Sequence, residues 1–412
     1  MAASDSDADA DASSLPAPIH LLPPDALHNV LLRLPLRDAV VCRPVSRLFH
    51  ETLSPNFLAL LPTLRLLLLR HPRPEGGGCL HAFDPDRRHW LRLPFSAFLP
   101  NQSFSPVASS PSLLYLWVEA AASTSPPSLP SSSSSSSSSS TAHPPKSLAV
   151  CNPFAGTYSF LPPLGSAWAR HGTVLAGSGG VVLVLTELAA LSYTPSGSGK
   201  WMKHPLSLPS KPRSPILASG AGAVFALCDV GTPWRSQWKL FSCPLSMLTG
   251  GWAPVERSAW VDVFEMLKRP RLLAGAGGRC VLMIGGLKSS LAIDAPCSTV
   301  LILRLDLATM EWDEAGHMPP NMYRCFTGLC EAAAQGNTMP TAVAGGNNKV
   351  KVFGGDGKVW FAGKRVRGKL AMWEEDELGN SGGKWDWVDG VPGYSDGVYR
   401  GFVFDGGFTA MP

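Results

Sequence analysis

The sequence has little charge, and its N-terminus lacks the features of an export signal. Only 16% of the 412 residues are charged, and the formal net charge is +4. This near balance argues against a nucleic-acid-binding protein that relies on a basic surface. Residues 1–14 are acidic and lack both the basic start and the apolar run of a secretory signal.

No apolar run is long enough for a membrane span. The longest such stretch, residues 53–69, is interrupted by Pro55, Pro62 and Arg65. We therefore expect a soluble, intracellular protein of the cytoplasm and/or nucleus, with no contact to a membrane.

Motifs for metal binding and catalysis are also missing. No two of the nine cysteines are spaced as C-x-x-C, which argues against a zinc knuckle. The sequence contains no phosphate-binding loop G-x-x-x-x-G-K-[ST] and no H-E-x-x-H. We predict no catalytic residue, no metal site and no cofactor, and hence a protein that acts by binding.

Residues 15–69 differ from the rest because they contain none of the 40 glycines. Leu27, Val30, Leu31 and Leu34 follow the i, i+3, i+4, i+7 pattern of an amphipathic helix, which Pro35 ends. Two more short helical pieces follow. A unit of roughly 45 residues buries little of its own surface, so its apolar face is expected to need a partner.

The order of apolar and proline positions in this segment is specific. Leu22-Pro23 precedes Leu27 and Val30-Leu31, and these are followed by Leu34-Pro35-Leu36 and Val45-Ser46. This order resembles the F-box, although Phe49 stands where that family usually has tryptophan. The resemblance implies that residues 15–60 bind a Skp-type adaptor and, through it, a cullin–RING ubiquitin ligase. The residues assigned to adaptor binding are Leu22, Pro23, Leu27, Val30, Leu31, Leu34, Pro35, Leu36, Val45, Ser46, Leu48 and Phe49. A small helical cap on the next domain is the alternative.

The rest of the chain reads as a repeat of short strands separated by glycine and proline turns. Each unit has an extended segment, a polar turn, an aromatic residue and then a proline. The aromatic anchors are Trp90, Tyr158, Trp201, Trp252, Trp312 and Trp385. A glycine pair, a strand, a turn and a tryptophan in roughly 50 residues resemble the kelch repeat. One large aromatic per repeat is expected to fill the gap between neighbouring sheets.

We therefore predict an α+β multidomain protein, with a small three-helix F-box followed by an all-β kelch-type propeller. Six blades fit the length best, seven are the alternative count, and another propeller family or a pair of β-sandwiches stays open. The predicted boundaries are a disordered acidic N-terminus over 1–14, the F-box over 15–60, a helical or linker segment over 61–80 and the propeller over 81–412. A disordered insertion over 123–147 contains ten consecutive serines, 131–140.

Two segments are candidates for contact with a target protein. Residues 317–325 follow an aromatic anchor, and we expect them to form a long loop on one propeller face, with Tyr323 and Arg324 as target-binding residues. Residues 364–369 form a basic run, which we interpret as a solvated turn between two strands rather than as a site for an acidic target.

Together these features predict the substrate-recognition subunit of an SCF (Skp–cullin–F-box) ubiquitin ligase, similar to plant members of the F-box/kelch family. Such a subunit binds one or more target proteins and promotes their ubiquitination and proteasomal degradation without catalytic residues of its own. One alternative is an F-box protein that acts through the adaptor without ubiquitination of a target. Another is a copper enzyme similar to galactose oxidase, since kelch propellers resemble the central domain of that enzyme.

Overall fold

A computed structural model describes two compact units, Met1–Leu64 and Arg65–Pro412. The residues that it describes are 19–71, 79–95, 99, 102–120, 146–165, 168, 171–197, 199–257, 260–290, 297–328, 350–376, 382–393, 396–408 and 410–412. The acidic residues 1–14 and the serine run 131–140 lie outside this part of the chain.

The first unit consists of short helices, as predicted. A 3-10 turn, η1 (Ile19–Leu21), precedes α1 (Pro24–Leu31), α2 (Leu36–Cys42), α3 (Arg47–Thr52) and α4 (Pro55–Leu58). Pro24 and Pro55 each stand in the first turn of a helix, where a missing N–H costs nothing. Ser46 and Ser54 cap α3 and α4, because each hydroxyl oxygen accepts a hydrogen bond from the backbone N–H three residues later.

The second unit is a propeller of six four-stranded antiparallel sheets, which confirms the predicted blade count. Sheet 1 contains β24 (Arg400–Gly406), β1 (Leu64–Arg70), β2 (Cys79–Asp84) and β3 (His89–Pro94). Sheet 2 contains β4 (Gln102–Ser110), β5 (Leu113–Ala120), β6 (Lys146–Asn152) and β7 (Thr157–Phe160). Sheet 3 contains β8 (Thr173–Ala176), β9 (Val182–Leu185), β10 (Ala189–Tyr193) and β11 (Met202–Pro205). Sheet 4 contains β12 (Arg213–Ala218), β13 (Ala223–Asp229), β14 (Trp238–Pro244) and β15 (Ala253–Pro254). Sheet 5 contains β16 (Leu267–Ala274), β17 (Cys280–Lys288), β18 (Cys297–Asp306) and β19 (Trp312–His317). Sheet 6 contains β20 (Lys351–Gly355), β21 (Lys358–Gly363), β22 (Val366–Glu374) and β23 (Lys384–Asp389).

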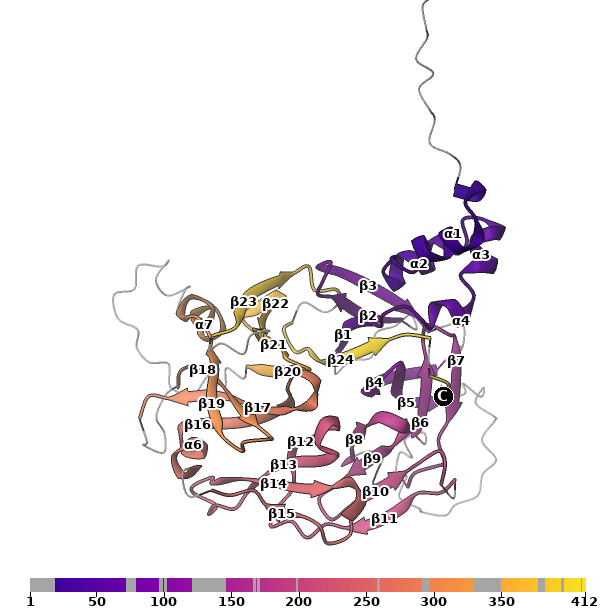
Figure 1. The fold of residues 1–412 in the computed structure, drawn as a ribbon. Helices are drawn as coiled ribbons and strands as arrows, with labels where there is room; N and C mark the ends of the chain where they lie inside the picture. Colours follow the sequence, from indigo (N-terminus) through magenta and orange to yellow (C-terminus); the bar gives the residue numbers. More distant parts are fainter. Residues whose placement is uncertain are drawn as a thin grey trace, which may run out of the picture. The chain divides into compact units, whose positions relative to one another are not determined.

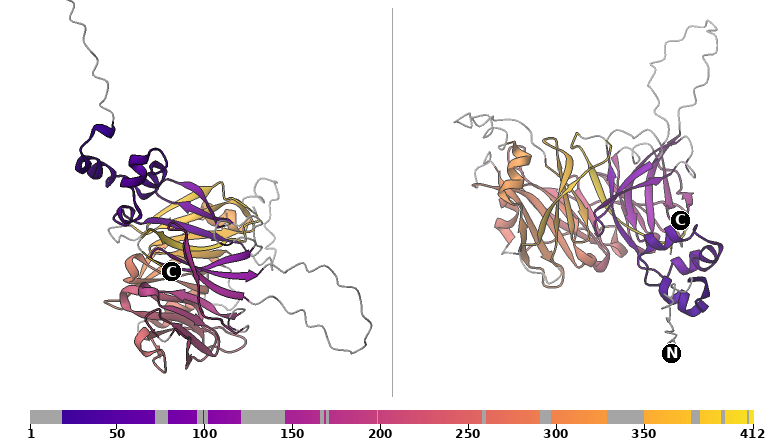
Figure 2. Two further views of the ribbon diagram at one scale, coloured as in Figure 1. Left: turned by 90° about the vertical axis from the view of Figure 1, so that its right-hand side faces the viewer. Right: turned by 90° about the horizontal axis from the view of Figure 1, so that it is seen from above.

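The sheets follow one another around a common axis (Figure 1), and Figure 2 shows them from two further sides. The innermost strands β24, β4, β8, β12, β16 and β20 contact one another in a closed ring. Each described core cluster joins two neighbouring sheets, so the apolar core lies between blades. This explains the fully apolar glycine-led strands: Val182–Leu185, for example, is buried on both faces.

Sheet 1 closes the ring, because its innermost strand comes from the other end of the propeller sequence. β24 lies beside β1, so residues near 400 complete a sheet begun near residue 64. The expected helical or linker segment over 61–80 is therefore wrong: Leu64–Arg70 is a strand whose residues 66–69 are all buried.

The two ends of the propeller axis carry different residues, which define a near end and a far end. At the near end, Arg65 at the start of β1 forms ion pairs with Asp356 and Asp405. The turns between first and second strands gather there, since Asp356 donates its N–H to Ala274 O and Ser112 donates its N–H to Asp405 O. The far end carries Arg70, Arg213 and Arg400, at the opposite ends of the same strands.

The aromatic anchors occupy one equivalent place in every sheet. Trp90, Tyr158, Trp312 and Trp385 lie in the fourth strands, and Trp201 and Trp252 directly precede theirs. Trp90 donates its indole N–H to Asp389 O of the preceding sheet at 2.9 Å, and Trp201 donates to Pro162 O at 2.9 Å. Tyr158 departs from the expectation that each anchor fills a gap, because its side chain is 43% exposed.

Candidate functional site

The predicted adaptor-binding residues separate into a buried and an accessible set. Leu27, Leu31 and Leu36 are buried, so the assignment of these three to adaptor contact is wrong for this conformation: they serve the fold of the helices. Leu34 and Phe49 are half-buried. The exposed members are Leu22, Pro23, Val30, Pro35, Val45, Ser46 and Leu48. Ser46 is also the helix cap described above, which gives this residue a structural role.

Four further apolar side chains are exposed in the same segment, and sequence reasoning did not single them out. Ile19 and Leu21 lie in η1, and Val40 and Val41 lie on α2. The missed signal was the helical period of Leu36–Cys42: Leu36 and Ala39 point inward, which places Val41 on the opposite side. Exposed apolar residues so dense in about 30 positions are unusual for a surface that meets only water.

The segment chosen for target binding is a helix instead of a loop. Pro320–Thr327 forms α7, which begins at Pro320 and ends at the left-handed residue Gly328. Met322 and Phe326 are buried because they lie four residues apart on one face. Tyr323 is half-buried and donates its hydroxyl to Cys297 O at 3.0 Å, while Arg324 is exposed. Burial raises the pKa of Tyr323 to about 12.

The basic run over 364–369 is confirmed as a turn at its start. Lys364 and Arg365 are exposed between β21 and β22, and the remaining residues belong to β22. Lys369 lies over the ring of Trp387 at 4.4 Å, so its charge already has a partner.

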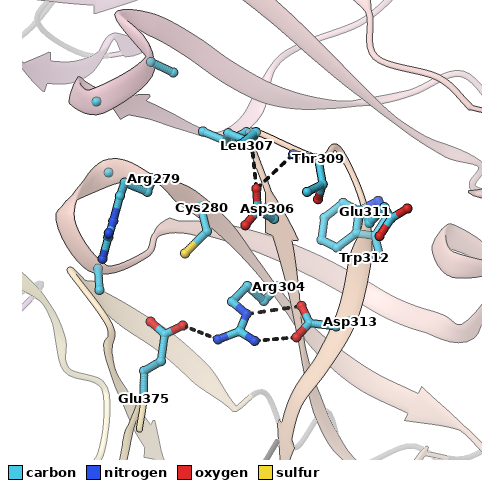
Figure 3. Close-up of a pocket in the computed structure, with 15 residues that line it drawn as sticks. Arg279, Cys280, Arg304, Asp306, Leu307, Thr309, Glu311, Trp312, Asp313 and Glu375 are labelled. Carbon is cyan, nitrogen blue, oxygen red and sulfur yellow. Dashed lines mark hydrogen bonds and ion pairs between the residues drawn. The ribbon is translucent and has the colours of Figure 1, made fainter. Parts of the chain in front are cut away.

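A cavity of about 900 Å³ opens at the near end between sheets 4, 5 and 6 (Figure 3). Arg304 crosses it and binds both oxygens of Asp313, at 3.2 and 2.5 Å, as well as Glu375 Oε1 at 2.9 Å. Asp306 accepts hydrogen bonds from the N–H groups of Ala308 and Thr309, which lower the pKa of this carboxyl.

Several of the charged groups of this cavity are therefore engaged with one another, whereas Glu375 Oε2 and Trp312 Nε1 are buried without a hydrogen-bond partner. The Asp313 carboxylate raises the pKa of Arg304, and burial raises the pKa of the Cys280 thiol to about 11. A thiol with a raised pKa is a poor nucleophile at neutral pH. The hydrogen bonds of Asp306 stabilise the turn between β18 and β19.

Within the ranges given above, no group of three or more His, Cys, Asp or Glu side chains is placed to hold a metal ion. No helix in the same ranges is long and apolar enough to cross a membrane.

The first unit matches a known family model. Residues 19–57 match the model of the F-box domain. The chain is 45% identical over 417 residues to SKP1-interacting partner 15 of Arabidopsis thaliana, and the alignment covers 96% of this chain and 99% of that protein.

Likeness to solved structures is weaker. TolB from Acinetobacter baumannii matches with 9% identity and a TM-score of 0.45, over 87% of this chain and 71% of that chain. A fungal alcohol oxidase in complex with copper matches with 14% identity and a TM-score of 0.36, over 59% of this chain and 50% of the other.

Proposed function

The chain belongs to the F-box protein family, and on this premise we propose that it is the substrate-recognition subunit of an SCF-type ubiquitin ligase. The helical unit binds a Skp-type adaptor, which connects the chain to a cullin–RING ligase. The propeller binds a target protein, whose ubiquitination and proteasomal degradation follow. The relative from Arabidopsis thaliana is named for an interaction with SKP1. We propose the cytoplasm and/or nucleus as the place of action.

The observation that carries the proposal is the set of exposed apolar side chains on the helical unit. Val30, Val41 and Val45 are large apolar residues that are 45%, 63% and 69% exposed. Burying such side chains against another helix contributes about 25 cal/mol per Å² of apolar surface. Helix-on-helix docking is the binding mode that this arrangement favours.

The receptor role follows from what the propeller offers. A ligase of this kind accelerates ubiquitin transfer by holding the target near an enzyme that carries ubiquitin, so the receptor supplies proximity and no reacting group. An F-box protein that acts through the adaptor without ubiquitination of a target is the alternative function.

Adaptor binding is tested with two matched variants of the full chain. Val45 is 69% exposed within the F-box match, and Leu60 is 67% exposed outside it. We expect Val45→Asp to weaken binding to a co-expressed Skp-type adaptor by about 3 kcal/mol, over a hundredfold, because the interface would bury an unpaired carboxylate. Leu60→Asp should bind like the wild type. The readout is co-elution in size-exclusion chromatography and the Kd from calorimetry.

Full binding by Val45→Asp would refute docking through this surface, and equal loss in both variants would indicate a general effect of charge. Ubiquitination is tested separately. The reconstituted ligase with this chain should modify a protein captured by the propeller. A captured protein that stays unmodified in the complete complex would favour the alternative function.

A further inference from the structure

Four arginines gather around the propeller axis at the far end. Arg213 and Arg400 are the first residues of the innermost strands β12 and β24, and Arg271 lies within the innermost strand β16. Arg70 is the last residue of β1, beside β24. These residues are separated by up to 330 positions in the sequence, and only the closed ring of strands brings them together.

The arginines interact across the ring. Sheet 6 stands between sheets 5 and 1, yet Arg271 of sheet 5 interacts with Arg400 of sheet 1 as well as with Arg213 of sheet 4. The surrounding protein and these two like charges lower the pKa of Arg271. Burial and Arg400 lower the pKa of Arg70 in the same way. Arg271 also donates an Nη1 hydrogen bond to Ser214 Oγ at 3.2 Å, which turns it toward Arg213.

The structure gives these four arginines no carboxylate partner within the part of the chain that it describes. Among the described residues, none of the four arginines forms an ion pair, in contrast to Arg65 at the near end, which pairs with both Asp356 and Asp405. Arg213, Arg271 and Arg400 are exposed, so their guanidinium N–H groups are available to a ligand. Like charges held close together cost folding free energy, and an anion bound between them would remove that cost.

The same end of the propeller presents two exposed apolar side chains. Trp234 is 87% exposed between β13 and β14, and Leu188 is 81% exposed between β9 and β10. Both connections lead from the second to the third strand of a sheet, as does the end of β1 at Arg70. Tryptophan and arginine are the residue types enriched where protein interfaces concentrate their binding energy.

We propose that the far end of the propeller binds a segment of a target protein that carries clustered oxyanions, phosphoryl or carboxylate. Arg213, Arg271 and Arg400 hold the oxyanions, and Trp234 receives an apolar residue of the same segment. The planar guanidinium group suits this role because it donates two parallel hydrogen bonds to either kind of oxyanion. This inference rests on the proposed function in one respect, namely that the propeller binds a target protein.

The test measures peptide binding to the full chain by fluorescence anisotropy. Three degenerate libraries of 12-residue peptides carry a fixed pair of phosphoserines, glutamates or serines, three positions apart. We expect one or both acidic libraries to bind and the serine library to bind at least tenfold more weakly. Tighter binding of the phosphoserine library identifies a phosphorylated target, and equal binding identifies an acidic one.

Arg271→Gln and Arg400→Gln should each weaken binding about tenfold, which corresponds to about 1.4 kcal/mol. Arg367→Gln is the matched control, since Arg367 is exposed but lies on the third strand of its sheet, away from the axis. Thermal unfolding should show that the two axial variants are at least as stable as the wild type, because they relieve repulsion.

Three results would overturn the inference: no preference for the acidic libraries, equal loss in Arg367→Gln, or tighter binding of a single-stranded oligonucleotide of equal charge. Co-elution with the adaptor shows whether a chain that fails to bind the peptides also fails the proposed function. The axial variants should bind the adaptor normally, and a chain that ignores the adaptor can still be tested for peptide binding.

Discussion

Asn152 is the residue whose removal should most affect the closure of the propeller. It is fully buried at the end of β6, and its side-chain oxygen accepts hydrogen bonds from the N–H groups of Phe154 and Ala155 at 3.0 and 3.1 Å. Its amide nitrogen donates to Gly407 O and Ala410 O at 3.0 and 2.9 Å. One side chain thus forms the turn before β7 and also holds the segment that follows β24, the strand that closes the ring.

Asn152→Ala removes all four hydrogen bonds and leaves buried backbone groups without partners. At about 1 kcal/mol per hydrogen bond, we expect a loss of about 4 kcal/mol. A domain of roughly 350 residues unfolds with an entropy of about 0.7 kcal/mol/K, so the melting temperature should fall by about 5–6 °C.

Asn152→Asp is the informative second variant, because it keeps the oxygen that forms the turn and loses only the two donors to the C-terminal segment. We measure thermal unfolding by calorimetry, and the release of C-terminal residues by carboxypeptidase with mass spectrometry. Both variants should lose C-terminal residues faster than the wild type. A fall of less than about 1 °C in Asn152→Ala, together with unchanged digestion, would refute the claim that this side chain locks the ring.

Two further predictions concern single residues of the propeller. Trp252→Ala should destabilise by about 3–5 kcal/mol and Tyr158→Ala by less than 1 kcal/mol, since Trp252 is 7% exposed and Tyr158 is 43% exposed; comparable losses in urea unfolding would contradict this difference. Burial raises the pKa of the Cys151 thiol from about 9 in the unfolded chain to about 12, so the folded state favours the neutral thiol. This contribution is complete below pH 9 and is lost as the pH rises from 9 to 12, so the stability of the wild type should fall more steeply over that range than that of Cys151→Ala; parallel pH profiles would show that the thiol does not titrate in this way.

The propeller could be predicted from the sequence because its signals are local. A glycine-led apolar strand, a turn and an aromatic residue occur within each repeat, and each aromatic anchor is one of the first two residues of a fourth strand or directly precedes it. The turns repeat as well: Asp84, Asn152 and Asp306 each end a third strand, and each side chain accepts hydrogen bonds from the backbone N–H groups two and three residues later. Hydrogen bonds between residues this close in sequence can be predicted from the residue types alone.

Other features depended on partners that the sequence does not place. Residues 66–69 of β1 are a short apolar run, which periodicity cannot assign to a helix or a strand, and one of the two neighbours of β1 in its sheet lies near residue 400. Within the F-box, the pattern marks which residues are apolar, yet Leu31 is buried and Val45 is exposed. A charge at Leu31 would therefore test folding, whereas a charge at Val45 tests binding.

The arginine cluster also depends on residues that lie far apart in the sequence. The net charge of the chain therefore did not predict it. A net charge of +4 over the chain gives no sign of a local concentration of cations. The topology creates it: all innermost strands run in one direction along the axis, so residues at their starts meet at one end even when they lie far apart in sequence. Arg213 and Arg400 occupy such starts, and Arg65 is the second residue of β1, at the other end. A peptide held between the axial arginines would thus leave the start of β1, where the chain from the helical unit joins the propeller, unobstructed.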